Sequence, residues 1–134
     1  MRSAGLVATI GGVLLMTNIA HGADALIGPT WRIDTVNGAV VSDPSKAKLV
    51  VDANGRVSTT VGCNQMSGMA TIAGASLSFG PFASTRMACE PALMELEQRY
   101  GVALAATRAF KIDGKMLKFT DGAGRELITF TLVS

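Results

Sequence analysis

Two short stretches of the chain contain the cysteines and polar residues that could form a binding site. Residues 62–68 read G-C-N-Q-M-S-G, and residues 79–89 read F-G-P-F-A-S-T-R-M-A-C. Each stretch contains one of the only two cysteines, Cys63 and Cys89, and two cysteines in an exported chain form a disulfide by default. That bond would hold the two stretches together as one patch. The candidate binding residues of this patch are Asn64, Ser67, Thr85 and Arg86.

Arg86 is the strongest candidate for ligand contact in the patch. It is a planar cation in a loop of small and apolar neighbours, so it could bind a carboxylate or phosphate through two parallel hydrogen bonds. The alternative is that Arg86 satisfies loop carbonyls. Asn64 has a structural alternative too, because its side chain can cap its own turn. Gly62 and Gly68 can each allow a backbone conformation with positive φ or a close approach between strands.

Catalytic chemistry finds little support in the sequence. The only histidine, His21, lies in the N-terminal leader, so the rest of the chain lacks an imidazole for Ser-His or Cys-His catalysis. No G-x-S-x-G elbow, P-loop or G-x-G-x-x-G fingerprint is present. Glu95 and Glu97 stand two apart in an expected helix and point to different faces, so we interpret them as solvated charges. The sequence predicts a non-enzyme without catalytic residues, cofactor or metal.

Methionines near the cysteines keep a soft-metal alternative open. Those close to Cys63 and Cys89 are Met66, Met69, Met87 and Met94. Thioether and thiolate groups are soft ligands suited to Cu(I). No repeated M-x-x-M array is present, and we favour the interpretation that these residues fill the core flexibly.

The secondary structure predicted around this patch consists mostly of strands. Alternating apolar residues, bounded by turn signals such as Asn37-Gly38 and Asn54-Gly55, predict about eight short strands. They cover residues 31–36, 46–52, 56–62, 69–72, 77–79, 107–112, 115–120 and 126–132. Short strands at close spacing predict a mainly β fold with a small antiparallel barrel-like sheet.

Residues 91–106 break this rhythm and predict one α-helix packed on the sheet. Pro91 suits the first helical position. Apolar residues recur at helical spacing at Leu93, Leu96, Tyr100, Ala103 and Leu104. Trp31, at the start of the first strand, is expected to anchor the core rather than to stack on a ligand.

Residues 1–22 predict a cleaved signal peptide. Arg2 gives a minimal positive region, and an uncharged, mostly apolar stretch covers residues 4–16. Small residues precede two possible cleavage points, after Gly22 and after Ala25. No cysteine stands directly after the apolar stretch, so the sequence has no lipobox there. A retained anchor is the alternative, but about 20 apolar residues are needed to span a bilayer.

The charge balance argues against nucleic acid as a partner. Removing Arg2 from the 12 Lys and Arg leaves 11 against 10 Asp and Glu, a formal charge of +1. No run of Lys or Arg could neutralise several phosphates. With 49% hydrophobic and 16% charged residues, the chain favours one folded domain over disorder. We expect a monomer with no transmembrane segment after the leader.

The two stretches resemble the META domain family, whose namesake in the bacterial envelope is the heat-shock protein HslJ. The resemblance rests on G-C-N-x-x-S-G, then S-T-R-M-x-C, with a leading G-x-x-W, and runs over about residues 26–132. It implies a small β-barrel-like fold with one packed helix, an envelope location, and links to heat shock and novobiocin tolerance. No catalytic residues are established for the family. HslJ members are typically lipoproteins, and this sequence departs from them there.

These observations predict a non-catalytic, exported META-domain protein of the bacterial envelope, periplasmic or secreted. Its role would be a stress-related binding module for an unknown protein or small ligand. Two alternatives stay open: a periplasmic copper binder that uses Met and Cys, and a small secreted hydrolase inhibitor. Free thiols would favour the first, and a tight one-to-one complex with a protease would favour the second.

Overall fold

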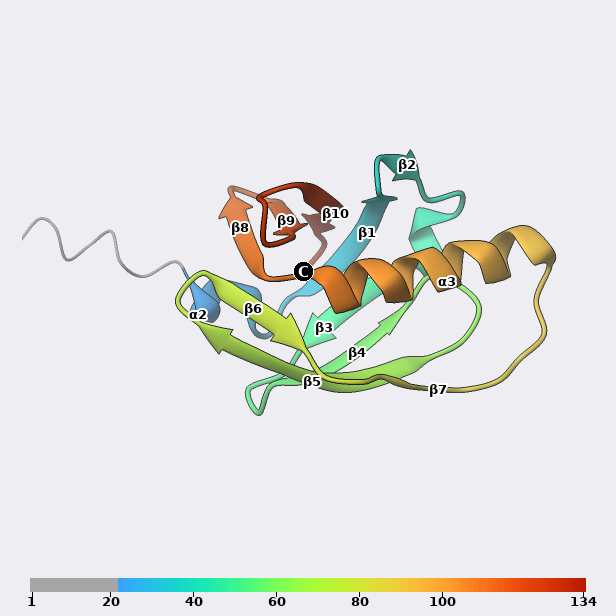
Figure 1. Cartoon of the computed structure of the whole chain (residues 1–134), viewed down its shortest axis with the longest axis horizontal. Helices are drawn as coiled ribbons and strands as arrows, with labels where there is room; N and C mark the ends of the chain where they lie inside the picture. Colours follow the sequence, from blue (N-terminus) through green and yellow to red (C-terminus); the bar gives the residue numbers. More distant parts are fainter. Residues whose placement is uncertain (1–21) are drawn as a thin grey trace, which may run out of the picture.

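The computed structural model describes residues 22–134 of the chain (Figure 1). The predicted signal peptide, residues 1–22, therefore lies outside the described residues except for Gly22. Within the described range, no helix combines the length and the apolar character needed to cross a membrane.

Eight antiparallel strands close into a barrel, which confirms the predicted fold class. In their order around the barrel they are β1 (Thr30–Val36), β3 (Lys48–Val51), β4 (Arg56–Thr60), β5 (Met66–Ala73), β6 (Ser76–Phe79), β8 (Ala109–Asp113), β9 (Met116–Thr120) and β10 (Glu126–Leu132). The barrel closes because β10 pairs back onto β1. The join between β6 and β8 is the shortest, with the single residue pair Ser76 and Ala109.

Several short elements escape the sequence prediction. They are α2 (Ala23–Leu26), β2 (Ala39–Val40), the 3-10 helix η1 (Pro44–Lys46) and β7 (Ala83–Ser84). Strands of two residues are too short to show a period-two pattern. β5 also begins at Met66 rather than at the expected Met69, because residues 66 and 67 pair with both β4 and β7.

The Asn37-Gly38 turn takes the backbone conformation that its residue types predict. Asn37 has φ 50° and Gly38 has φ 82°, so both residues adopt the left-handed region. Tight hairpin turns of the primed type need positive φ at both central positions, which Asn and Gly tolerate. The turn joins β1 to β2, which pairs with the end of β1.

The core fills the barrel interior. Its largest fully buried side chains are Trp31, Tyr100, Phe119 and Phe130. Trp31 is 1% exposed, as expected for a core anchor, and its Nε1 donates a hydrogen bond to Leu26 O at 3.2 Å. Leu26 is itself fully buried, so α2 is docked onto the barrel.

The predicted helix is α3 (Pro91–Ala106), which lies across the barrel (Figure 1). Its buried residues are Leu96, Tyr100, Ala103 and Leu104, and Leu93 is partly buried against the core. The helix packs against β1, β6 and β10. The expected apolar face is therefore confirmed.

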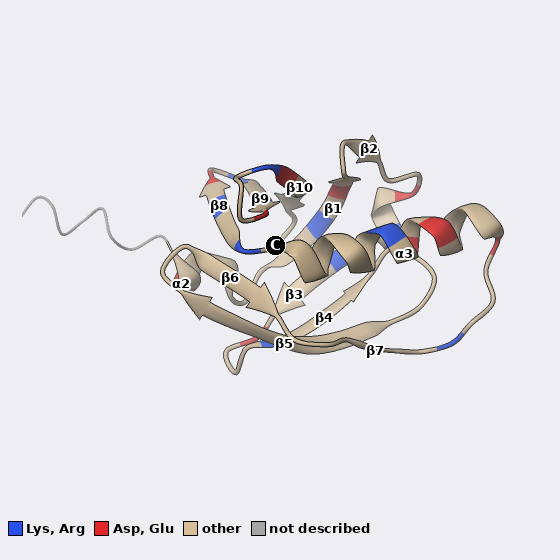
Figure 2. Cartoon of the chain, in the orientation of Figure 1, with Lys and Arg blue, Asp and Glu red and all other residues tan. Residues whose placement is uncertain are grey.

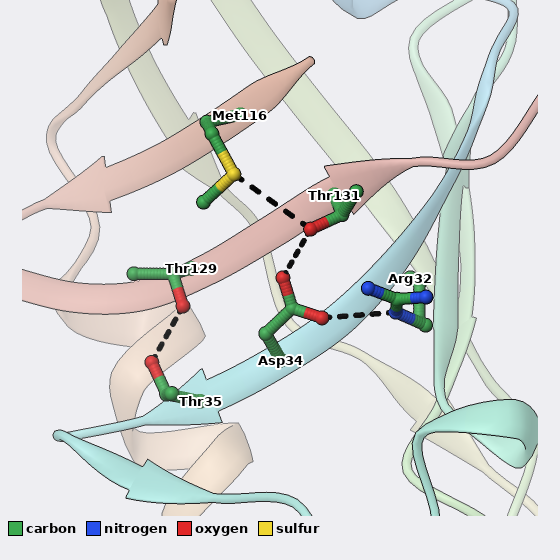
Figure 3. A network of polar contacts seen from close by, with 6 residues as sticks. All are labelled: Arg32, Asp34, Thr35, Met116, Thr129 and Thr131. Atoms are coloured by element: carbon green, nitrogen blue, oxygen red, sulfur yellow. Dashed lines mark hydrogen bonds and ion pairs between the residues drawn. The ribbon is translucent and has the colours of Figure 1, made fainter.

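A polar network on the outside of the barrel joins β1 to β10 (Figure 3). Asp34 lies at an irregularity in the register of these two strands. Its carboxylate accepts a hydrogen bond from Arg32 Nε at 3.0 Å and another from the Thr131 hydroxyl. The hydroxyls of Thr35 and Thr129 are hydrogen-bonded at 2.6 Å. Because these groups satisfy one another, we assign the network to barrel closure.

Candidate functional site

The two stretches singled out in the sequence meet near the beginning of α3. The sulfurs of Cys63 and Cys89 are 1.97 Å apart, at disulfide distance, as the sequence predicts. Cys63 follows β4, and Cys89 precedes α3, so the pair ties the segment between β6 and α3 back to the barrel. We call this segment, residues 80–90, the strap.

Asn64 is the centre of hydrogen bonding where the strap meets the barrel. It is buried, and its Oδ1 accepts hydrogen bonds from Thr85 Oγ1 at 2.9 Å and from the Met87 backbone N–H at 2.6 Å. Its backbone N and its Nδ2 donate to the two carboxylate oxygens of Glu97 at 2.8 and 2.9 Å. Asn64 thus has a structural role, but its bonds reach the strap and α3 rather than its own turn.

Glu97 differs from its interpretation as a solvated helix charge. Both of its carboxylate oxygens are engaged by Asn64, which lies 33 positions earlier in the chain. Glu95, two positions before it, is exposed, and both residues line a common hollow along α3, so they are not separated as sharply as the helical spacing suggests. No local pattern in the sequence indicates the Glu97 contact, because it forms only when the strap and α3 come together.

The other three candidate residues differ in their contacts. The Gln65 backbone N–H donates to Thr85 Oγ1 at 3.0 Å, and its carbonyl accepts from the Thr85 N–H at 3.1 Å. Ser67, on β5, accepts a long hydrogen bond from Arg56 Nη1 at 3.4 Å. Arg86 is exposed, and its side chain makes no hydrogen bond or ion pair with any residue in the range 22–134.

The structure explains why both ends of the first stretch are glycines. Gly62 has φ 115°, a conformation that residues with a Cβ rarely adopt. A Cβ on Gly68 would lie 3.0 Å from the ring of Phe82. The strap therefore depends on Gly68, because its Phe82 ring packs directly over that backbone.

An open hollow of about 710 Å³ lies between the strap and the first half of α3. Its lining consists of Asn64, residues 82–88 of the strap, and Met94 and Glu97 of α3. A second hollow of about 680 Å³ shares Ser84, Met94 and Glu97 with the first and continues along α3. We call the two together the strap groove. Figure 2 shows a basic position on the strap and acidic positions along the first half of α3.

Three methionines line the strap groove. Met87 is 58% exposed and Met94 47%, whereas Met66 is buried. Paired cysteines offer no thiolate, so a soft-metal site here would consist of thioethers without cysteine. Within residues 22–134, no group of three or more His, Cys, Asp or Glu is placed to hold a metal ion.

The structure brings the four predicted patch residues close together. Asn64, Thr85 and Arg86 line the strap groove, and Ser67 lines a third hollow that shares Thr85 with it. Their predicted role in ligand contact remains a prediction. Sequence reasoning missed Glu97, whose contact joins distant parts of the chain.

The sequence matches a known protein family. The META domain family model matches residues 24–134. No curated protein matches the chain.

Three solved structures have a similar fold. One NMR structure has a TM-score of 0.65 and 22% identity, over 81% of this chain and 92% of that chain. The NMR structure of a protein from Burkholderia xenovorans has a TM-score of 0.67 and 21% identity, over 83% and 86%. The crystal structure of a DUF4847 family protein from Bacteroides vulgatus has a TM-score of 0.64 and 12% identity, over 81% and 94%. These identities support a common fold and nothing further.

Proposed function

The chain belongs to the META domain family, and we propose that it is a non-catalytic binding module that holds its partner in the strap groove. One observation carries this proposal. The polar groups of Asn64, Thr85 and Glu97 bond one another, whereas the Arg86 guanidinium has no partner within the described residues. An unpaired cation on a backbone that hydrogen bonds and the cysteine pair hold in place can receive an anionic group without rearrangement of the strap.

The hydrogen bonds between Asn64 and Glu97 favour binding rather than catalysis. General acid–base catalysis needs a proton acceptor or donor that is free to reach the substrate. Glu97, a carboxylate that lines the same hollow as Arg86, already accepts two hydrogen bonds from Asn64. The chain after the leader also contains no histidine.

We place this binding module in the periplasm, after removal of the leader, and in the response to envelope stress. The predicted signal peptide and the cysteine pair at disulfide distance support export, because the periplasm is oxidising. The stress role rests on the resemblance to the heat-shock protein HslJ alone.

Site-specific photocrosslinking in living cells tests the binding groove. A photoreactive amino acid replaces Met87, whose exposed side chain lines the groove and whose contact with Asn64 uses only the backbone. The control carries the same group at Lys111, an exposed position on β8. Cells are heat-stressed before irradiation.

The proposal predicts a crosslinked species from position 87, absent from position 111, that is lost when Arg86→Ala is added. Equal crosslinking from both positions would contradict the groove as the binding site. A single crosslinked protease with loss of its activity would favour the hydrolase-inhibitor alternative instead.

A further inference from the structure

β7 presents one hydrogen-bonding edge to β5 and leaves the other open. Its residues pair with β5 as Met66 with Ser84 and Ser67 with Ala83. The Thr85 N–H donates to Gln65 O at 3.1 Å, so Thr85 faces β5. Backbone groups alternate between the two edges of an antiparallel strand. The N–H and C=O of Ser84 therefore point away from β5, at an exposed position that lines the strap groove.

The groove beside this open edge offers apolar and cationic side-chain contacts, whereas Glu95 and Glu97 place carboxylates along the α3 side. Met87 and Met94 give exposed, adaptable apolar surface, and Ala88 extends it. Arg86 gives a positive charge with no ion-pair partner in residues 22–134. The chemistry on offer is therefore backbone pairing, apolar contact and one site for a carboxylate.

We propose that the strap groove binds an extended peptide segment that adds as a strand to the open edge of β7. A carboxylate of the peptide, from an Asp or Glu side chain, pairs with Arg86, and an apolar side chain of the peptide contacts Met87 and Met94. Strand addition gives affinity through the main chain and specificity through alternate side chains. This inference rests on the proposed function, because it names the partner of the same groove.

The built-in rigidity of the strap favours a peptide as the occupant. Residues 82–88 are consecutive and line the first hollow of the groove. Three contacts fix them to the barrel: the hydrogen bonds to Asn64, the packing of the Phe82 ring on Gly68, and the Cys63–Cys89 pair. An edge that is fixed in advance lowers the ordering cost when an extended chain pairs with it.

Ser84→Pro removes the outward N–H of Ser84 without removing a hydrogen bond to β5, because that N–H faces the groove. Proline is tolerated on strand edges for this reason. Ser84→Ala is the matched control, since it removes the hydroxyl and keeps the N–H. Arg86→Gln removes the charge and keeps a polar side chain of similar reach.

A random peptide library displayed on phage is selected on the purified protein, expressed as the full chain. The inference predicts enriched peptides that combine an acidic and an apolar residue. Synthetic copies should bind Ser84→Ala as they bind the unaltered protein. Their affinity should fall at least about tenfold for Ser84→Pro and for Arg86→Gln. N-methylation of alternate backbone nitrogens in the peptide should abolish binding.

The outcomes separate this inference from the proposed function. Peptides that lose affinity for Arg86→Gln but tolerate Ser84→Pro and N-methylation would overturn strand addition while leaving the groove as a binding site. Peptides indifferent to both variants, or no enriched peptide at all, would overturn the inference, and the crosslinking result at position 87 would then decide the groove by itself.

Discussion

The Asn64 side chain shows how much of the candidate site depends on a single amide. Its oxygen accepts from the strap, and its nitrogen donates to Glu97, so both ends are in use. The contacts with Thr85 and Met87 span 21 and 23 positions, and those with Glu97 span 33. Local patterns identified Asn64 as a turn residue but could not predict partners so distant in the chain. The structure shows Arg86 exposed and without an ion-pair partner in residues 22–134, and its role in ligand contact stays a prediction.

Asn64→Asp tests this network with a change that keeps the shape of the side chain. The new carboxylate oxygen would replace the Nδ2 donor and would face the Glu97 carboxylate at about the present 2.9 Å, so a hydrogen bond would become a repulsion. We expect the free energy of unfolding at neutral pH to fall by about 2 kcal/mol or more. Urea unfolding followed by Trp31 fluorescence measures it.

The sign of the pH effect provides an internal control for that variant. Repulsion raises the pKa of the carboxyl pair in the folded state, so the lost stability should return as the pH falls through that raised value. Ser67→Ala, on β5, should change the unfolding free energy by less than about 0.5 kcal/mol. A variant as stable as the unaltered protein at neutral pH would show that Asn64 does not hold the strap.

Arg86→Ala should leave folding nearly intact and impair function. The side chain is exposed and has no ion pair within the described range, so the stability change should stay within about 0.5 kcal/mol. Survival of heat-stressed cells that carry the variant should drop toward that of cells lacking the protein. A lower melting temperature with an unchanged stress phenotype would instead make Arg86 a structural residue.

Hydrophobic periodicity predicted the helix and the strands that are long enough to show a repeating pattern. Eight strands and the helix at residues 91–106 follow from alternation and helical spacing. β7 has two residues, and no alternation can be read from two positions. The residue types around β7 were singled out for their chemistry, but its role as an edge strand appears only through its pairing with β5.

Tyr100 makes the packing of α3 dependent on pH at the alkaline end. Its hydroxyl is hydrogen-bonded to Thr59 Oγ1 at 2.6 Å, and burial raises its pKa well above the usual value. The stabilising effect is full below pH of about 10, the usual tyrosine value, and is lost above it, because only the unfolded state ionises there.

Ultraviolet titration measures this directly, since Tyr100 is the only tyrosine. Its ionisation should coincide with unfolding at alkaline pH rather than precede it. Tyr100→Phe should remove this tyrosine contribution to alkaline unfolding, and cost about 1 kcal/mol at neutral pH for the lost hydrogen bond. Ionisation near the usual pKa in a still-folded protein would show that the Tyr100 hydroxyl reaches solvent.

The contacts of α2 distinguish the two possible cleavage points of the predicted signal peptide. Leu26 is fully buried, its carbonyl accepts from Trp31 Nε1, and the Ile27 N–H bonds to Ala23 O. Cleavage after Gly22 keeps these contacts, whereas cleavage after Ala25 puts a charged amino group beside the buried Leu26 side chain.

We therefore expect a mature chain that begins at Ala23, identified by mass spectrometry of the periplasmic fraction. A purified chain that begins at Leu26 should unfold at lower urea concentration than one that begins at Ala23. Equal stability of the two would show that α2 adds nothing to the fold. A species that begins at Met1 in the membrane pellet would contradict cleavage altogether.

At the scale of the whole molecule, closure of the barrel lay beyond what local patterns predict. β1 and β10 lie at opposite ends of the domain, and their register contains an irregularity at Asp34. β6 and β8 join through one residue pair, and the strap and α3 occupy the chain between them. The groove therefore arises at the connection between these two strands, a position that only the closed barrel defines.

The binding proposal requires that Cys63 and Cys89 join the two stretches into one patch before any partner binds. In the chain-entropy account, a bond between residues 26 positions apart contributes roughly 3.5 kcal/mol, a large share of a typical domain's stability. Thiol counting on the denatured protein, purified from cells without any reductant, tests for this bond. We predict no free thiol. Two free thiols per chain would remove both the bond and the preformed patch.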